Sequence, residues 1–147
     1  TTNKMVDVSL ESIKSNSQKR ISTLNGDVLH VLKCSDIDFK KFGEIYFSWI
    51  EKGSIKAWKK HKRMTMNIVV PFGKVKFVFF DEDSQTYRNE EIGEDNYLRL
   101  TIPPGLWFGF KDMTENRSLI TNIADIEHDD NEVDRLDINE IKYDWNN

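Results

Sequence analysis

The sequence predicts a single all-β domain, and three observations lead to that prediction. The chain has 147 residues, the size of one ordinary domain, and its 38% hydrophobic and 12% aromatic residues are enough to build one core. Short strand-like segments separated by turn residues follow one another along most of its length. No internal repeat, low-complexity tract or linker divides the chain, so we expect residues 1–147 to form one domain.

The expected strands recur at the short spacing that is typical of a β-sandwich or barrel. They are Arg20 to Leu24, Asp27 to Lys33, Gly43 to Ile50, Ser54 to Trp58, Met64 to Pro71, Lys74 to Asp81, Tyr97 to Ile102, Trp107 to Lys111 and Ser118 to Ala124. The segment that begins at Lys74 alternates polar and apolar residues and then ends in an apolar run. One face of that strand should therefore be wet at its start, and both faces should be covered later.

Turn residues punctuate these strands. Asn25-Gly26 is a strong hairpin signal, and Gly53, Gly73 and Gly105 stand between strands, where a positive φ is most often needed. The acidic stretch Asp125 to Asp137 ends the strand pattern. We expect residues 125–147 to form a solvated cap with a short helix, packed loosely against the body.

Charge and cysteine content exclude several classes of protein. Lys and Arg number 21 against 25 Asp and Glu, and the net charge of -4 gives no general attraction to nucleic acid or to an anionic membrane. The single cysteine, Cys34, cannot form an intrachain disulfide. The longest apolar run is far shorter than the roughly 20 residues that span a bilayer. We therefore expect a cytoplasmic protein with no nucleic-acid or membrane partner.

One set of spacings carries the functional information. Gly53, positions 59, 61 and 66, and Gly73 have the spacing of the first cupin motif, which reads G-x5-H-x-H-x4-E-x6-G in metal-binding members. Of the three ligand positions only His61 holds a ligand residue, because Lys59 and Met66 occupy the other two.

The second cupin motif, P-x-G-x2-H, is present as Pro103 to Phe108, with phenylalanine in place of the last ligand. A transition metal needs three or four converging N, O or S donors, and one imidazole beside a lysine does not supply them. We therefore expect no metal site and no other cofactor.

Several longer segments share a pattern with one branch of the cupins. They are Gly43 to Ser48, Gly53 to Trp58, Met64 to Asn67, Gly73 to Asp81, Ile102 to Phe110, and Asn122. Through them the stretch from Gly26 to Trp145 resembles the dTDP-4-dehydrorhamnose 3,5-epimerase family, a metal-free group that acts on nucleotide-linked 4-keto sugars. The resemblance implies a cupin-type jelly-roll β-barrel with a minor C-terminal helix. It also implies a homodimer, in which residues 1–24 form a strand segment exchanged between subunits.

The family's chemistry removes a proton beside a ketone and returns one to the other face of the resulting enolate. The resemblance assigns the base to a His in an R-G-x-H element, the donor to a Tyr on a later strand, and enolate stabilisation to a Lys. A further His lies in a W-H-G-F loop. In this chain the base position holds Lys59, the enolate-stabilising position holds Met66, and the His position of the W-H-G-F loop holds Phe108. The position of the donor Tyr falls near Ser118.

Lys59 and His61 are therefore the candidate catalytic residues. They lie two positions apart on one expected strand, and so on one face of it. A partly buried lysine near another cation has a lowered pKa, which would let Lys59 act as the base. Alternatively Lys59 stays charged and stabilises the enolate while His61 moves the proton. Both assignments stay open at this point.

The remaining site candidates would bind the substrate. They are Lys56, Arg63 and Arg99 for phosphate groups, Tyr97 and Trp107 for stacking, and Asn67. The sequence thus favours a sugar-nucleotide epimerase or isomerase of surface-glycan biosynthesis that uses a nucleotide-diphosphate sugar. The alternative is a non-catalytic cupin that binds a carbohydrate or a partner and has lost the usual proton-transfer residues.

Overall fold

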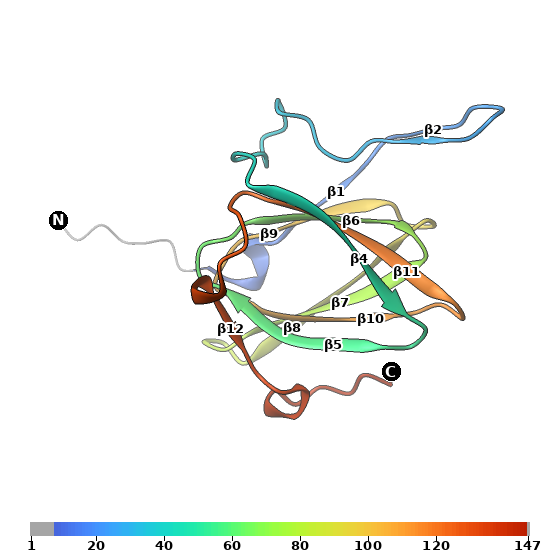
Figure 1. Cartoon of the computed structure of the whole chain (residues 1–147). Helices are drawn as coiled ribbons and strands as arrows, with labels where there is room; N and C mark the ends of the chain where they lie inside the picture. Colours follow the sequence, from blue (N-terminus) through green and yellow to red (C-terminus); the bar gives the residue numbers. More distant parts are fainter. Residues whose placement is uncertain (1–7, 147) are drawn as a thin grey trace.

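The computed structural model describes residues 8–146, which form two five-stranded antiparallel sheets packed face to face (Figure 1). The first sheet has the order β1 (Lys14–Ser17), β9 (Leu98–Ile102), β6 (Met66–Phe72), β11 (Arg117–Ala124) and β4 (Glu44–Glu51). The second has the order β12 (Val133–Arg135), β5 (Ile55–His61), β10 (Trp107–Asp112), β7 (Lys74–Asp81) and β8 (Thr86–Gly93). The predicted all-β, jelly-roll class is confirmed.

The main core lies between the two sheets. Inward-facing side chains of β6, β7 and β9 meet there with zero or near-zero exposure, among them Val70, Phe77, Phe79 and Leu100. Every residue of β7 after Lys74 is buried, so the wet start of this strand is a single residue long. The covered end follows from a second layer of packing on the outer face of the second sheet.

That outer layer comes from the C-terminal segment, which differs from the solvated cap expected over 125–147. Ile141 and Trp145 pack with Trp58 and Phe80 against the second sheet and are less than a tenth exposed. The expected short helix takes the form of two 3-10 turns, η2 (Asp130–Glu132) and η3 (Ile138–Glu140), on either side of strand β12. Its apolar residues are too widely spaced among acids to stand out in the sequence, yet they cover the sheet.

Besides the short β12, two strands of the sheets lie outside the strand segments expected from the residue pattern, although β1 falls within the segment 1–24 that the resemblance implies. Strand β8 pairs with β7 along its whole length, although its sequence, TYRNEEIG, is polar and half-exposed. Strand β1 is fully exposed and pairs with β9. Neither strand shows the apolar alternation from which strands are recognised, because each lies at the edge of its sheet and neither buries a continuous apolar face.

The turn between β6 and β7 requires its glycine. Gly73 has a φ of +88°, and a Cβ built there would lie 2.2 Å from Ser118 Oγ. Both the backbone conformation and the close approach exclude a side chain at this position. The predicted positive φ is also present at Gly53 and Gly105.

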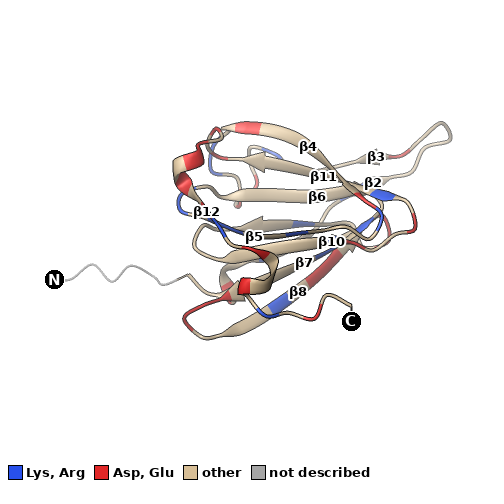
Figure 2. Ribbon diagram, turned by 60° about the horizontal axis from the view of Figure 1, so that its bottom comes forward, with Lys and Arg blue, Asp and Glu red and all other residues tan. Residues whose placement is uncertain are grey.

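A short hairpin, β2 (Arg20–Ile21) and β3 (Val28–Leu29), projects from the body, and its turn contains Gly26 (Figure 1, Figure 2). We call residues 18–42 the arm. The proposed exchanged segment 1–24 runs into it, and residues 1–7 of that segment lie outside the described part of the chain. Within residues 8–146 no helix has the length and hydropathy needed to cross a membrane.

Candidate active site

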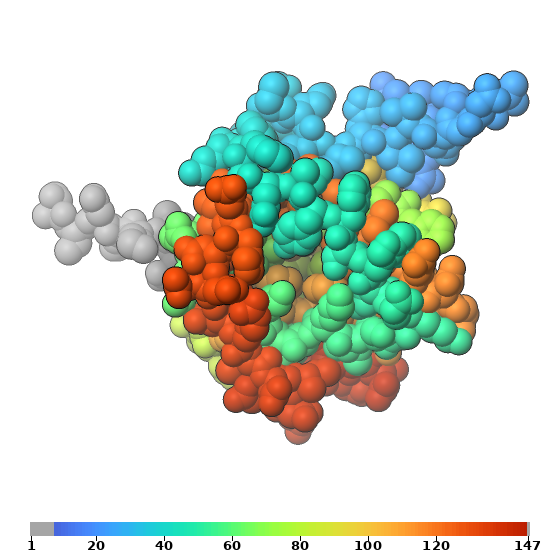
Figure 3. All heavy atoms as spheres, viewed as in Figure 1, coloured from blue at the N-terminus to red at the C-terminus, as the bar shows by residue number. Residues whose placement is uncertain are grey.

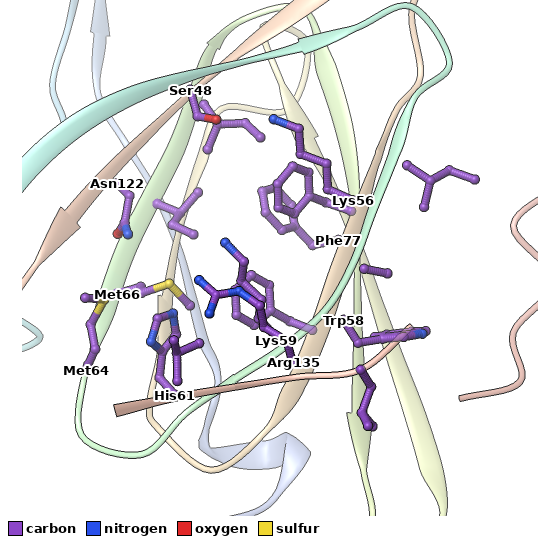
Figure 4. A pocket seen from close by; sticks show the side chains of 18 of the residues that line it. Ser48, Lys56, Trp58, Lys59, His61, Met64, Met66, Phe77, Asn122 and Arg135 are labelled. Carbon is purple, nitrogen blue, oxygen red and sulfur yellow. The ribbon is translucent and has the colours of Figure 1, made fainter. Parts of the chain in front are cut away.

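A cavity of about 630 Å³ opens between the two sheets, on the side where the edge strands β4 and β12 leave the sandwich open. Its volume lies in the range of small-molecule sites. Strands β4, β6 and β11 form one wall, and β5, β10 and β12 form the other. Figure 3 shows the hollow in this face, and Figure 4 shows side chains that line it. The floor is apolar, formed by residues such as Ile68, Phe77 and Phe110.

His61 and Lys59 both line this cavity, as their spacing on one strand predicts. His61 is the last residue of β5 and is 8% exposed. Its ring stacks on Phe108, with centroids 5.8 Å apart. Its Nδ1 lies 2.5 Å from Oε1 of Glu132, a residue 71 positions away in the chain. The imidazole is therefore fixed by packing on one side and by a carboxylate on the other.

Glu132 is a buried carboxylate, only 2% exposed. Burial raises its pKa, but hydrogen bonds from His61 and from the backbone N–H groups of Arg63 and Met64 outweigh burial. The net effect is a pKa below the ordinary value, so Glu132 is ionised near neutral pH.

This ionised carboxylate determines which nitrogen of His61 carries the proton. A carboxylate only accepts hydrogen bonds, so Nδ1 of the neutral ring must be the donor and Nε2 is left with a free lone pair. Among the described residues, Nε2 has no hydrogen-bond partner of its own. A histidine oriented in this way is equipped to take a proton from a ligand in the cavity.

Three cationic side chains stand around the same opening. Lys56 and Lys59 project from β5, and Arg135 pairs with Lys59 across the β5–β12 ladder. Burial, and then the charges of Arg135 and Lys56, hold the pKa of the Lys59 ammonium below its ordinary value of 10.5. In residues 8–146 no carboxylate lies within 4.0 Å of these three groups. The mutual repulsion would be relieved by an anionic ligand.

Two of the other sequence candidates lie outside the cavity on the second sheet's side. Arg63 is exposed and pairs with Asp129 at 3.0 Å. Trp107 packs in the outer cluster beneath the C-terminal segment, and the ammonium of Lys60 lies 5.0 Å from its ring centroid. Regular alternation along β10 turns Trp107 away from the cavity, because Phe108 and Phe110 line it.

Asn67, Tyr97 and Arg99 are brought together, but on the outer face of the first sheet. Arg99 is 2% exposed and contacts Asp36 and Asp38, at 3.2 and 3.3 Å. The Tyr97 hydroxyl donates to the backbone oxygen of the arm residue at position 30, and the Asn67 amide donates to that at position 38. These three residues hold the returning part of the arm against the sheet.

Sequence reasoning did not find Glu132 or Arg135. Both belong to the acidic stretch that reads as solvent-exposed, and only the pairing of β12 with β5 brings Arg135 to the cavity and Glu132 to His61. A signal was present in the pattern: Val133 stands between polar neighbours, as in a short half-buried strand. Within residues 8–146, no three His, Cys, Asp or Glu side chains are grouped so as to hold a metal ion.

Comparison with known proteins finds a similar epimerase, a polysaccharide biosynthesis protein and a sugar isomerase. The probable low-salt glycan biosynthesis epimerase Agl13 of Haloferax volcanii is 30% identical over 151 residues, covering 95% of this chain and 94% of the relative. The spore coat polysaccharide biosynthesis protein SpsL of Bacillus subtilis is 28% identical over 114 residues, covering 71% and 76%. A dTDP sugar isomerase structure from Desulfovibrio desulfuricans superposes with a TM-score of 0.87 at 34% identity, covering 92% of each chain. No family model matches the chain.

Proposed function

Because the chain belongs to the dTDP-4-dehydrorhamnose 3,5-epimerase-like family of sugar-nucleotide epimerases and isomerases, we propose that it converts a nucleotide-linked 4-keto sugar during surface-glycan biosynthesis. The observation that carries this proposal is the oriented His61 inside the cavity, with Glu132 behind it. A bare binding module has no need of an imidazole whose free nitrogen is held toward its ligand. The relatives' names, epimerase and isomerase, favour the enzyme over the non-catalytic alternative in the same way.

In the proposed reaction His61 is the base. Its Nε2 takes the proton from the carbon beside the ketone, and the positive charge that forms on the ring is stabilised by Glu132. Lys59 keeps its proton and faces the enolate oxygen, which is the second of the two roles that the sequence left open. Negative charge that forms next to Lys59 offsets the burial, and the repulsion from Arg135 and Lys56, that lower its pKa.

The diphosphate is assigned to the cations at the opening. Lys56 and Arg135 lie at the cavity with no ion pair to a described carboxylate, and a guanidinium matches the geometry of phosphate oxygens. The apolar floor would accept the deoxygenated edge of a sugar ring. We therefore place the sugar inside, and the nucleotide at the mouth.

The test is isotope exchange. The protein is incubated in D₂O with dTDP-4-keto-6-deoxyglucose, and proton NMR follows the signals of the carbons beside the ketone. The proposal predicts loss of at least one of these signals. Binding of the nucleotide sugar without exchange, for this sugar and for its epimers, would instead identify a binding module.

A second proposal concerns assembly: the arm packs against another copy of this chain to form a homodimer. Large apolar side chains on the arm face water, notably Leu24, which is 99% exposed, and Ile37, which is 92% exposed. Phe42 and Val28 are more than half exposed as well. A second copy would cover this surface, which a monomer leaves wet.

A further inference from the structure

The wall of the cavity opposite His61 carries a polar pair. Tyr46 on β4 and Asn122 on β11 are directly opposed in the antiparallel register, and both line the cavity. The alternation confirms that they face inward, because Ser48 also lines the cavity and Ile50 is fully buried. Tyr46 is 42% exposed since β4 is the edge strand. Figure 4 shows Ser48 and Asn122 on this wall, away from His61.

The hydrogen bond between the two leaves two atoms free for a ligand. Asn122 is 2% exposed, and its Nδ2 donates to the Tyr46 hydroxyl oxygen at 2.8 Å. The amide oxygen of Asn122 is buried and has no hydrogen-bond partner in the described residues. The hydroxyl hydrogen of Tyr46 likewise has no acceptor there. The wall thus offers one donor and one acceptor to whatever occupies the cavity.

In this chain the position of the family's proton donor offers no side chain to the cavity. Ser118, near which that position falls, is fully buried and does not line the cavity. Its hydroxyl donates to Asp112 at 2.6 Å and accepts from the backbone N–H of Lys74 at 2.9 Å. On the first-sheet wall the described residues offer two hydroxyls, those of Tyr46 and Ser48. A phenol is a far stronger acid than an aliphatic alcohol, which favours the tyrosine.

We propose that Tyr46 is the proton donor of the reaction, acting on the face of the sugar ring opposite His61, and that Asn122 is its positioning residue. This inference rests on the proposed function. His61 takes the C–H proton, and the electron pair of that bond passes into the enolate. Tyr46 then gives its phenolic proton to the other face of the same carbon and becomes a phenolate. Proton transfer through solvent from the imidazolium restores both groups.

The arrangement has a stereochemical consequence. His61 projects from the second sheet and Tyr46 from the first, so a ring held between the sheets meets the base on one face and the acid on the other. Removal and return of a proton on opposite faces inverts the carbon. The product of the wild-type protein should therefore be an epimer at a carbon beside the ketone, rather than a sugar with its ketone moved.

The test compares Tyr46→Phe with the wild type in D₂O, with dTDP-4-keto-6-deoxyglucose as substrate. Without the phenol, His61 still removes the proton and, after exchange with solvent, returns deuterium to the same face. We expect Tyr46→Phe to lose epimer formation by a factor of about 10²–10⁴ while deuterium still enters the unconverted substrate. Asn122→Ala should show the same uncoupling to a smaller degree. Tyr87→Phe is the matched control, since the Tyr87 hydroxyl donates to Lys142 O outside the cavity.

Two results would overturn the inference. One is epimer formation by Tyr46→Phe at the wild-type rate. The other is equal loss of exchange and of epimer in a Tyr46→Phe protein that melts like the wild type, which would make Tyr46 a binding group. Absence of exchange in the wild type, by contrast, refutes the proposed function itself, and the donor assignment falls with it.

Discussion

At the scale of single residues, the site is defined by one buried hydrogen-bonded pair, His61 and Glu132. Glu132 has almost no contact with solvent and is surrounded by donors from His61, Arg63 and Met64. Its carboxylate holds the Nδ1 proton and leaves Nε2 available. The orientation of the His61 ring is therefore set by a residue from a distant part of the chain.

Glu132→Gln tests this dependence, because a neutral amide stabilises the imidazolium less than a carboxylate does. We expect deuterium exchange to slow by roughly 10²-fold, the low end of the range for general acid–base groups. Affinity for the nucleotide should stay unchanged, since Glu132 does not line the cavity. Exchange at the wild-type rate would show that His61 works without its carboxylate.

Glu132 also predicts how stability depends on pH. Its folded-state pKa lies below the ordinary value of 4.5, so the folded protein binds fewer protons than the unfolded chain between the two values. This contribution to the free energy of unfolding is complete above pH 4.5 and is lost as the pH falls through the folded-state pKa. Denaturant titrations of Glu132→Gln at several acidic pH values should show a shallower fall than the wild type. An equal fall of the free energy of unfolding in the wild type and in Glu132→Gln would contradict the lowered pKa of Glu132.

The cations at the opening make a different prediction. Arg135→Gln removes a charge that repels Lys59 and attracts phosphate. We expect weaker nucleotide-sugar binding, by about tenfold for each 1.4 kcal/mol lost, with a smaller change in the rate at saturation. Lys52→Gln, whose ammonium pairs with Glu115 away from the cavity, is the matched control. Isothermal titration with the nucleotide measures both, and equal affinities for Arg135→Gln and the control would remove Arg135 from the site.

Sequence reasoning placed candidate residues correctly where they lie close together on one strand, and failed where their position depends on partners distant in the sequence. Lys59 and His61 are placed in the cavity because a strand's alternation puts residues two positions apart on one face. Lys56, three positions before Lys59, lines the same cavity because the pairing of β5 with β10 skips Trp58 and so interrupts the alternation. Asn67, Tyr97 and Arg99 are placed on the outer face of the first sheet, where they hold the arm. Nothing local in the sequence distinguishes a cation that holds a loop from one that holds a phosphate.

At the scale of elements, the strands that cannot be recognised from the sequence are the polar ones. Strand β8 follows β7 by a hairpin, and its register with β7 is complete, but its own residues alternate too weakly to be recognised. Strand β12 is three residues long and brings Arg135 beside Lys59. Both strands are specified by their neighbours, which supply an unpaired edge, more than by their own composition.

The C-terminal segment is a structural element of the second sheet, and Trp145 tests this. Its ring lies 5.4 Å from that of Trp58 and 4.9 Å from that of Tyr143, and it is 7% exposed. Trp145→Ala should lower the free energy of unfolding by about 3–5 kcal/mol, as for other buried aromatic truncations. Urea denaturation measures the loss, with the more exposed Met113→Ala as a control. A cost below about 1 kcal/mol would mean that the segment only rests on the sheet.

At the scale of the whole molecule, the sandwich places polar side chains of both sheets around one cavity and leaves the end between β4 and β12 open. The all-β class was predictable because strand spacing and turn glycines are local features, and the jelly-roll architecture was implied by the resemblance to the epimerase family. Which end of the sandwich opens was not predictable, since it depends on where the polar C-terminal stretch returns to the sheet.

The proposed homodimer is tested by changing exposed apolar residues of the arm. Leu24→Asp together with Ile37→Asp places charges on its most exposed apolar positions. We expect light scattering to give the mass of two chains for the wild type and a mass closer to the 17.3 kDa of one chain for the double variant. A monomeric wild type at micromolar concentration would refute the homodimer.

The central claim, that His61 removes a proton from a sugar bound between the sheets, is tested most directly by comparing deuterium uptake in the wild type and in His61→Asn. The exchange rate of the carbon-bound proton in dTDP-4-keto-6-deoxyglucose is followed by NMR at saturating substrate. The account predicts a fall of about 10²–10⁴-fold in His61→Asn, with nucleotide affinity retained. Exchange that continues at the wild-type rate would contradict it.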